Sequence, residues 1–424
     1  MPPTNILFVV IDDLNAWIGA LGRHPQVRTP NIDALARRGR IFVNAYCSAP
    51  YCNASRMGLF TGRLPATLGV YANEPFWDAP NRPQTFVERL RRAGYHCFGA
   101  GKVFHGVFDY ETALRERLAL APWREIENRD FLWDKYAPMP PEPLPLTRPL
   151  NGLFDFSAFD SVPEKYRLFD WGALRDDAEH ETPDAHVVRE VSAFLPAPPE
   201  PFFCAAGLYK PHLPWHAPKR YFDLYDRDTL HLPPVKEDDL EDVPEIARRW
   251  ALDPPDHALV TTRGVWRDAV QGYLACISYA DDMVGKIIDA LDRSPVRDRT
   301  AIVLCGDNGY HLGEKLHWRK FALWEEATRV PLIVATPGQA VGEQGIEPVS
   351  LIDIYATMMD LAGLPQDAGE SESLLKGPRR RPVVLDRNGR QHPRTEVVPS
   401  RHGGLLRDGR ADEVDGEAGR HGQS

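Results

Sequence analysis

The segment NILFVVIDD, residues 5–13, joins a strand-length apolar run to two aspartates. From Asn5 to Ile11 the segment shows no alternation of polar and apolar residues, and such continuous runs are typical of parallel strands buried on both faces. In open parallel sheets, ligands bind beyond the carboxyl ends of the strands. The segment therefore predicts a buried parallel strand that ends in Asp12 and Asp13 at a ligand-binding edge.

Apolar runs of similar length recur along the chain and alternate with segments of helical periodicity. Such alternation indicates an α/β fold with a doubly wound, mostly parallel sheet flanked by helices. A proline-rich stretch, PMPPEPLPLTRP at residues 138–149, predicts an extended loop, because proline fixes φ and lacks an N–H donor. Further strands are predicted at residues 41–43, 95–100, 202–208, 300–305 and 331–335, and helices at residues 30–39, 85–93, 185–195 and 265–291.

Reactive side chains follow several of the predicted strands. Each pair has an ordinary explanation when it is taken alone, because Asp-Asp and Asp-Asn-Gly are common turn sequences and a histidine before Leu-Pro is usually structural. Their coincidence at one edge of one sheet favours a functional site. The pairs are Asp12 with Asp13, Lys102 with His105, Lys210 with His212, and Asp307 with Asn308.

The acidic members of this set indicate a metal site. Asp12, Asp13, Asp307 and Asn308 offer only oxygen ligands, which hard cations such as Ca²⁺ and Mg²⁺ prefer. No thiolate or imidazole is needed, so zinc is disfavoured. We expect one divalent cation at the edge of the sheet, where it would neutralise charge on a group undergoing transfer.

A second informative stretch is CSAPYCNASRMGLFTGR, residues 47–63. If Cys52 begins a helix, it lies beside unpaired backbone N–H groups, which favour an anion. Arg56 is four residues further on, so it shares a helix face with Cys52 and adds a fixed charge suited to a tetrahedral oxyanion. The simpler interpretation of an isolated C-x-x-x-R is a buried thiol beside a surface arginine.

Net charge, apolar runs and cysteine content bear on the partners of the chain and on its compartment. A formal net charge of -10 over 424 residues argues against nucleic acid as a partner. No apolar run reaches the length of a membrane span, so no membrane partner is expected. The six cysteines include no C-x-x-C pair, which agrees with a reducing compartment. The N-terminus shows no signal peptide, so the chain as given is expected in the cytoplasm, or in the periplasm or secreted if a leader was trimmed.

The periodic pattern stops after about Pro365. We expect a catalytic α/β domain over residues 1–365 and an irregular, disordered segment over residues 366–424. Residues 377–424 are rich in Arg, Gly, Pro and Glu, and such a composition buries too little apolar surface to offset the entropy of ordering.

Several phrases together resemble the sulfatases of the alkaline-phosphatase superfamily, and among them the iduronate 2-sulfatase-like subgroup. Cys52 to Arg56 is similar to the C-x-P-S-R signature, with Ala54 in place of the usual proline. The resemblance covers about residues 5–365 and implies the alkaline-phosphatase-like fold. The other phrases that carry it are NILFVVIDD, TPNIDALARRG, GKVFH, KPHLPW and GDNGYHLGEKLHWRKFALWEEATRVPLIV.

The resemblance also implies roles for individual residues. Cys52 falls on the position that a maturation enzyme oxidises to formylglycine, and Arg56 on that of its partner. The hydrated formylglycine would attack sulfur, His105 would act as base when the aldehyde is regenerated, and His212 would protonate the leaving alcohol. Lys102 and Lys320 would surround the sulfate oxygens. The implied metal ligands are Asp12, Asp13, Cys52, Asp307 and Asn308, with Ca²⁺ favoured over Mg²⁺.

The expected reaction is hydrolysis of a small sulfate ester, such as that of a sulfated sugar or uronic acid. A phosphatase or phosphonate monoester hydrolase on the same scaffold is one alternative, because sulfuryl and phosphoryl groups are nearly isosteric. A truncated, non-catalytic relative is another, because the small antiparallel C-terminal subdomain usual in the family has no counterpart after Pro365.

Overall fold

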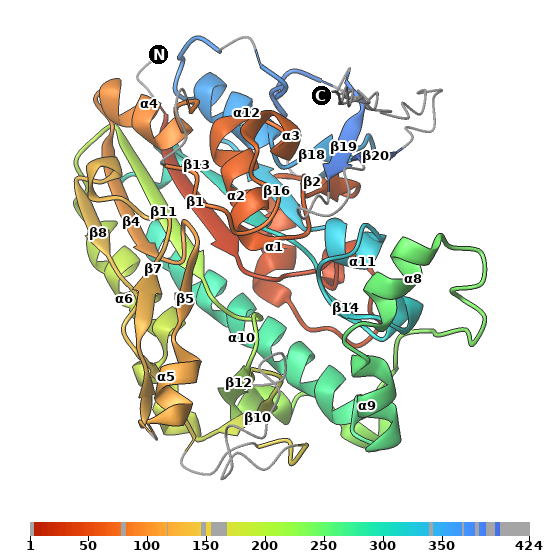
Figure 1. Ribbon diagram of the computed structural model, residues 1–424. Helices are drawn as coiled ribbons and strands as arrows, with labels where there is room; N and C mark the ends of the chain where they lie inside the picture. Colours follow the sequence, from red (N-terminus) through yellow and green to blue (C-terminus); the bar gives the residue numbers. More distant parts are fainter. Residues whose placement is uncertain are drawn as a thin grey trace, which may run out of the picture.

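A large mixed sheet forms the centre of the molecule (Figure 1). The computed structural model describes residues 4–77, 82–116, 118–145, 150–153, 168–338, 342–366, 369–377, 381–386 and 395–398. The sheet has eight strands, which from one edge to the other are β17 (Glu343–Gly345), β2 (Arg40–Phe42), β16 (Leu332–Ala335), β13 (Thr300–Gly306), β1 (Asn5–Ile11), β11 (Phe202–Leu208), β4 (His96–Gly101) and β8 (Lys135–Ala137).

The strands at the centre of the sheet run in one direction. β13, β1, β11, β4 and β8 pair in parallel, whereas β16 is antiparallel to both β13 and β2. Ile11 at the end of β1 lies opposite Gly306 of β13 and Leu208 of β11, so three strands end together at one edge. The prediction of a mostly parallel α/β sheet flanked by helices is confirmed.

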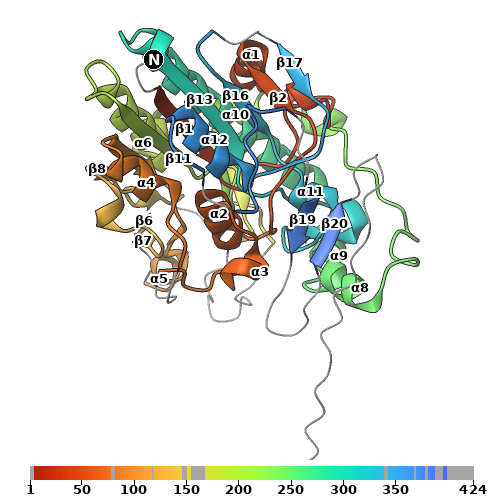
Figure 2. The same cartoon turned by 90° about the horizontal axis from the view of Figure 1, so that it is seen from above.

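Helices cover both faces of the sheet (Figures 1 and 2). Because successive side chains of a strand point to opposite faces, Val9 and Ile11 join the core on one side, and Phe8 and Val10 join the core on the other. The first core is covered by α1 (Pro30–Arg38), α6 (Pro183–Phe194) and α10 (Trp266–Asp292), and the second by α2 (Cys52–Thr61), α4 (Phe86–Arg92) and α12 (Asp353–Leu361).

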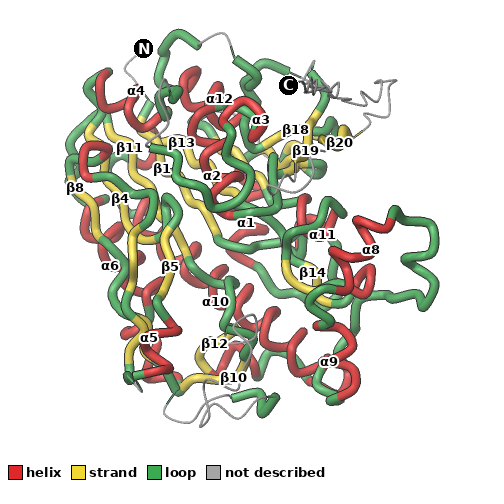
Figure 3. The backbone as a smooth tube through the Cα atoms, viewed as in Figure 1, coloured by secondary structure: helices red, strands yellow, loops and turns green. Residues whose placement is uncertain are grey.

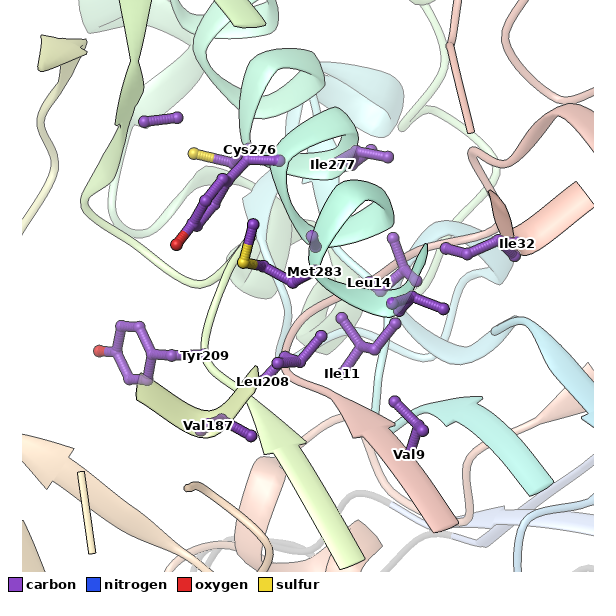
Figure 4. Close-up of a cluster of buried hydrophobic side chains, with 14 of the residues drawn as sticks. Val9, Ile11, Leu14, Ile32, Val187, Leu208, Tyr209, Cys276, Ile277 and Met283 are labelled. Atoms are coloured by element: carbon purple, nitrogen blue, oxygen red, sulfur yellow. The ribbon is translucent and has the colours of Figure 1, made fainter. Parts of the chain in front are cut away.

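The long helix α10 packs over the ends of the central strands. Its side chains Ile277 and Met283 belong to the same core as Ile11 and Leu208, the last residues of β1 and β11, and Met283 lies over Leu208 (Figure 4). All four side chains are fully buried, and burying an aliphatic side chain of this size stabilises the fold by about 1.5–3 kcal/mol. This packing holds the strand ends, and therefore the residues that follow them, in a fixed arrangement.

Shorter elements surround this framework (Figure 3). None of the helices in the described part of the chain combines the length and the apolar character that crossing a bilayer requires. The short helices are α3 (Pro65–Leu68), α5 (Tyr110–Arg115), α7 (Lys219–Phe222), α8 (Glu245–Leu252), α9 (Asp256–Thr262) and α11 (Glu325–Thr328). The small paired strands are β3 (Ala45–Tyr46) with β18 (Val349–Ser350), β5 (Gly106–Phe108) with β7 (Trp123–Glu125), β6 (Leu120–Ala121) with β9 (Glu142–Pro143), β10 (Trp171–Leu174) with β12 (Trp215–Pro218), β14 (His311–Leu312) with β15 (Trp318–Arg319), and β19 (Val383–Asp386) with β20 (Thr395–Val398).

Part of the segment expected to be an irregular tail packs against the domain. Val383 and Leu385 of β19 are buried and form a small cluster with Tyr46 of β3. The Asp386 N–H donates to the carbonyl of Ser48 at 2.8 Å. At these positions the structure differs from the expectation, because a local alternation of apolar side chains gives β19 one buried face. Residues 367–368, 378–380, 387–394 and 399–424 of the expected tail lie outside the described residues.

The packing of β19 predicts that this strand belongs to the cooperative fold. Leu385→Ala should lower the free energy of unfolding by about 2–5 kcal/mol, because it removes a buried side chain and leaves a cavity. Val384→Ala is the matched control, since its side chain is only partly buried, and it should cost clearly less. Urea unfolding followed by circular dichroism measures both changes. Small and equal losses of unfolding free energy in the two variants would indicate instead that β19 is dispensable to the fold.

Candidate active site

Helix α2 places Cys52 at its first position. Tyr51 before it is extended, with φ -141° and ψ 132°, and Gly62 closes the helix in the left-handed region at φ 67°. All ten residues of the helix are buried. The N–H groups of the first helical turn have no partners within the helix and carry partial positive charge. The sequence prediction that Cys52 begins a helix is thus confirmed, and the thiol lies where an anion is favoured.

Two aspartates and an asparagine converge at the ends of β1 and β13. The N–H groups of Asp13 and Asn308 both donate to Asp307 Oδ1, at 2.9 and 2.8 Å. Asn308 Nδ2 donates to Asp13 Oδ1 at 2.8 Å. Asp12, the fourth predicted ligand, is held by its own N–H, which donates to the carbonyl of Leu208 at 3.1 Å. All four side chains are at most 1% exposed, and the structure brings the predicted oxygen ligands together.

The donor set fits a hard cation. Carboxylate oxygens of Asp12, Asp13 and Asp307 lie within 4.8 Å of one another. Asn308 Oδ1 is buried and has no hydrogen-bond partner among the residues that the structure describes. Burial raises the pKa of Asp307 to about 7, and the neighbouring Asp12 and Asp13 carboxylates add to the shift. A group of crowded carboxylates with a free amide oxygen is the arrangement that Ca²⁺ or Mg²⁺ binds.

Arg56 acts as a brace between these elements. Its Nε donates to Asp307 Oδ2 at 2.9 Å and its Nη2 to Asp12 Oδ1 at 3.2 Å. Its Nη1 donates to the carbonyls of Lys102 and Val103, at 2.5 and 2.8 Å. The guanidinium is fully buried and all three nitrogens donate to protein acceptors. The structure therefore differs from the expectation that Arg56 offers its charge to a bound oxyanion, because the ends of β1, β13 and β4 take up that charge.

Two lysines supply the remaining positive charge. Lys102 Nζ contacts Asp12 Oδ2 at 2.5 Å, and Lys320 Nζ contacts Asp13 Oδ1 at 2.5 Å and Cys52 Sγ at 2.8 Å. Burial alone would raise the pKa of Asp12, but Lys102 and the other nearby cations hold it well below its ordinary value. Burial favours a neutral Lys320, yet contact with Asp13 raises its pKa. Lys320 therefore lies beside Cys52, and Lys102 lies beside Asp12.

As a plain cysteine, Cys52 is a weak nucleophile in this setting. Burial raises the pKa of the thiol well above its ordinary value, and the Asp12 carboxylate raises it further. Only the thiolate attacks efficiently. The side chain is also only 4% exposed, so burial disfavours the thiolate form at this position.

Two predicted histidines lie at the same edge of the sheet. His212 Nδ1 hydrogen-bonds to the carbonyl of Leu213 at 2.6 Å, and its Nε2 is 3.8 Å from Asp13 Oδ2. Burial lowers the pKa of His212 to about 4. Burial and the Lys102 ammonium lower the pKa of His105 to about 2, and no residue in the described part of the chain hydrogen-bonds to its buried Nδ1. These shifts favour the neutral form of both rings, and an anionic ligand beside them would favour their protonated forms.

Some supporting residues could not be found from the sequence. The Tyr273 hydroxyl of α10 donates to the Asp13 carbonyl at 2.8 Å and fixes Asp13 at φ 58°. Gly207 of β11 lets the backbone of Lys102 approach, because a Cβ there would meet the Lys102 carbonyl carbon at 2.1 Å. Ser55 Oγ donates to the Asp307 carbonyl at 2.5 Å. Ser55 stands within the Cys52 signature, whereas Tyr273 has no local sequence signal.

Comparison with known proteins finds sulfatases among the relatives in sequence and a hydrolase of the same fold among solved structures. A family model described as Sulfatase matches residues 4–364. The chain is 34% identical to a protein named Sulfatase from Formosa agariphila, over 88% of this chain and 72% of that protein. It is 28% identical to human iduronate 2-sulfatase, over 96% of this chain and 72% of that protein. The solved phosphonate monoester hydrolase of Agrobacterium radiobacter has the same fold, with a TM-score of 0.68 at 20% identity over 92% of this chain and 82% of that chain.

The crowded carboxylates predict that a cation stabilises the folded chain. Treatment with EDTA should lower Tm, and Ca²⁺ should restore it, by about 2.7 kcal/mol of stability when the free ion is at 100 times its Kd. Asn308→Ala should weaken this ion-dependent shift, because it removes the free amide oxygen. Asp223→Asn, at an exposed carboxylate, should leave the shift unchanged. A Tm that does not respond to chelator or ion in the parent protein would contradict the ligand set.

Proposed function

Because this chain belongs to the sulfatase family, we propose that it hydrolyses sulfate esters through a nucleophile made from Cys52. The observation that carries the proposal is the placement of Cys52 Sγ. It lies at the start of α2, 2.8 Å from Lys320 Nζ and 3.8 Å from Asp13 Oδ1. A group transferred to this position would meet a helix N-terminus, a cation site and two lysines at once.

The nucleophile in this proposal is the hydrate of formylglycine at position 52. This modification supplies a hydroxyl that attacks sulfur, which the buried thiol with its raised pKa cannot replace. A maturation enzyme would have to act before the chain folds, because Cys52 is 4% exposed and Arg56 is not exposed at all. Ala54 is equally buried, so a small residue is all that the folded state requires at the position where the family usually has proline.

The cation in this proposal is Ca²⁺. Asp12, Asp13, Asp307 and Asn308 would hold it together with the modified residue 52. When bound, it would neutralise negative charge on the sulfuryl group during transfer. Ca²⁺ is preferred over Mg²⁺ because the site offers protein oxygens from several directions, whereas Mg²⁺ usually keeps several of its waters.

The other residues of the site bind the ester and move protons. Lys102 and Lys320 point ammonium groups at the edge of the sheet, where they can hold the non-bridging sulfate oxygens. His212 Nδ1 donates to a backbone carbonyl, so Nε2 can protonate the leaving alcohol when the ring carries its second proton, a form that the bound anionic ester favours. His105 Nδ1 has no hydrogen-bond partner within the described ranges and can accept a proton from the nucleophile.

The substrate in this proposal is a small sulfated sugar or uronic acid. Similarity to human iduronate 2-sulfatase over 96% of this chain supports that class. The net charge of -10 disfavours a nucleic acid partner. Phosphate or phosphonate ester hydrolysis is the competing reaction, since the same lysines would face a phosphoryl group equally well. Turnover of an aryl sulfate compared with the matching aryl phosphate separates the two reactions.

Mass spectrometry of the peptide that spans Cys52 tests the nucleophile. In protein matured with a formylglycine-generating enzyme, the peptide should carry an aldehyde that reacts with a hydrazide probe, and aryl sulfate turnover should follow its stoichiometry. Cys52→Ala should abolish both signals. Full sulfatase activity in protein that carries only the unmodified thiol would contradict the proposal.

The role of His212 predicts a dependence on the leaving group. A sugar alkoxide needs a proton and a nitrophenolate hardly does, so His212→Ala should lose about 10²–10⁴-fold in kcat/KM on a sugar or alkyl sulfate. On nitrophenyl sulfate the loss should be far smaller, whereas His105→Ala should impair both substrates. Equal losses on the two substrates for His212→Ala would show that His212 binds sulfate and does not act as the acid.

A further inference from the structure

The loop that carries His212 is held from within by side chains of its own sequence. It follows β11 and runs from Tyr209 to the start of β12. The Tyr209 hydroxyl donates to the carbonyl of Leu213 at 3.2 Å, and Trp215 Nε1 donates to the carbonyl of Pro211 at 2.8 Å. Lys210 Nζ donates to the carbonyl of Pro214 at 2.8 Å. Three carbonyls of the loop, those of Pro211, Leu213 and Pro214, are therefore fixed by side chains of the same segment.

Among these donors Lys210 alone is charged, and its charge is balanced from outside the loop. Lys210 Nζ is 2.8 Å from Glu142 Oε1, with the two residues 4% and 2% exposed. The Tyr110 hydroxyl donates to the other oxygen of Glu142. Glu142 lies in β9, within the proline-rich stretch at residues 138–149, and Tyr110 begins α5. A segment far from the loop in sequence thus anchors it through one buried ion pair.

The backbone of the same residues is also fixed. The Asp184 carboxylate accepts from the Tyr209 N–H at 2.6 Å and from the Lys210 N–H at 3.0 Å. Asp184 belongs to the first turn of α6, which packs on the sheet. Lys210 is therefore held at its backbone by α6 and at its ammonium by Glu142, so the position of Nζ relative to the sheet is well defined.

His212 is oriented by a carbonyl of its own loop. His212 Nδ1 hydrogen-bonds to the carbonyl of Leu213, and the Tyr209 hydroxyl donates to the same carbonyl. The next carbonyl along the chain, that of Pro214, accepts from Lys210 Nζ. The direction of the imidazole therefore depends on two adjacent peptide groups. With these groups in place, Nε2 points to the site, 3.8 Å from Asp13 Oδ2.

A buried ion pair adds little to the stability of a fold, because the cost of desolvating both charges offsets most of their attraction. Apolar residues of similar volume often give the same stability. The directional hydrogen bonds of the pair nevertheless fix the geometry of the groups that they join. We infer that Lys210, through its pair with Glu142, is a positioning residue that aims His212 Nε2 at the leaving group of the substrate. This inference rests on the proposed function, in which His212 is the general acid.

The test removes both charges together, so that no buried charge remains unpaired. In the matured, full-length enzyme, Lys210→Met with Glu142→Gln should leave Tm nearly unchanged. Its kcat/KM on an alkyl sulfate should fall about 10²-fold, the loss expected when a catalytic group is misplaced by about 1 Å. On nitrophenyl sulfate the change should be less than about threefold, because that leaving group needs little help from an acid.

Three further variants define the comparison. Added to His212→Ala, the double substitution should cause no further loss on either substrate, because the residue that it positions is already absent. Lys210→Arg keeps the charge and the donors and should retain most of the activity on the alkyl sulfate. Lys219→Met with Asp223→Asn removes an exposed pair and should change neither the activity nor the ratio between substrates. Equal losses on the two substrates, additive losses with His212→Ala, or no loss at all would overturn the inference.

A readout that needs no turnover separates this inference from the proposed function. Diethyl pyrocarbonate should modify His212, whose side chain is 18% exposed, faster in the double variant than in the parent, with the buried His105 as the internal reference. If the double variant does not fold, Tyr110→Phe removes only the hydroxyl that anchors Glu142 and should shift the rate in the same direction. An unchanged His212 rate would contradict the positioning role even in a protein that hydrolyses no sulfate ester. A faster rate in such a protein would support the role and refute the function.

Discussion

The arrangement of the site depends on one buried guanidinium. Arg56 extends from α2 and binds Asp307 after β13, Asp12 after β1 and two carbonyls after β4. These acceptors come from three strands and would repel one another if nothing lay between them. Because the guanidinium is planar and its donors are fixed in direction, it sets the spacing of the strand ends as well as balancing their charge.

Beyond Arg56, the charged groups of the site are two lysine–aspartate pairs and the Asp307 carboxyl. Lys102 and Lys320 pair with Asp12 and Asp13, while burial raises the pKa of Asp307 to about 7 and the neighbouring carboxylates add to the shift. A divalent cation would relieve the repulsion among the three carboxylates, whose oxygens lie within 4.8 Å of one another. Under the proposed function, a cation that binds these carboxylates would leave Lys102 and Lys320 available to an anionic sulfate ester.

The sheet and the surrounding loops contribute differently to this chemistry. The strands and α2 carry the nucleophile position and the predicted ligands, and they are rigid because α10 and α12 bury both faces of β1. His212, the proposed general acid, instead lies on a loop, and a loop needs additional contacts to hold a side chain within about 0.5 Å of one geometry. The buried pair of Lys210 and Glu142 provides such a contact, and β19 similarly supports the segment before Cys52 through Ser48.

The sequence by itself determined the parallel sheet, the helix that begins at Cys52 and the reactive residues at the strand ends, because each is encoded by a local pattern of apolar runs, caps and turns. It could not show that Arg56 braces three strands, that Lys210 pairs with Glu142, or that β19 packs on β3. Only the tertiary structure decided these points. In the sequence a buried charge looks the same as an exposed one, and its role depends on partners that folding brings from distant segments.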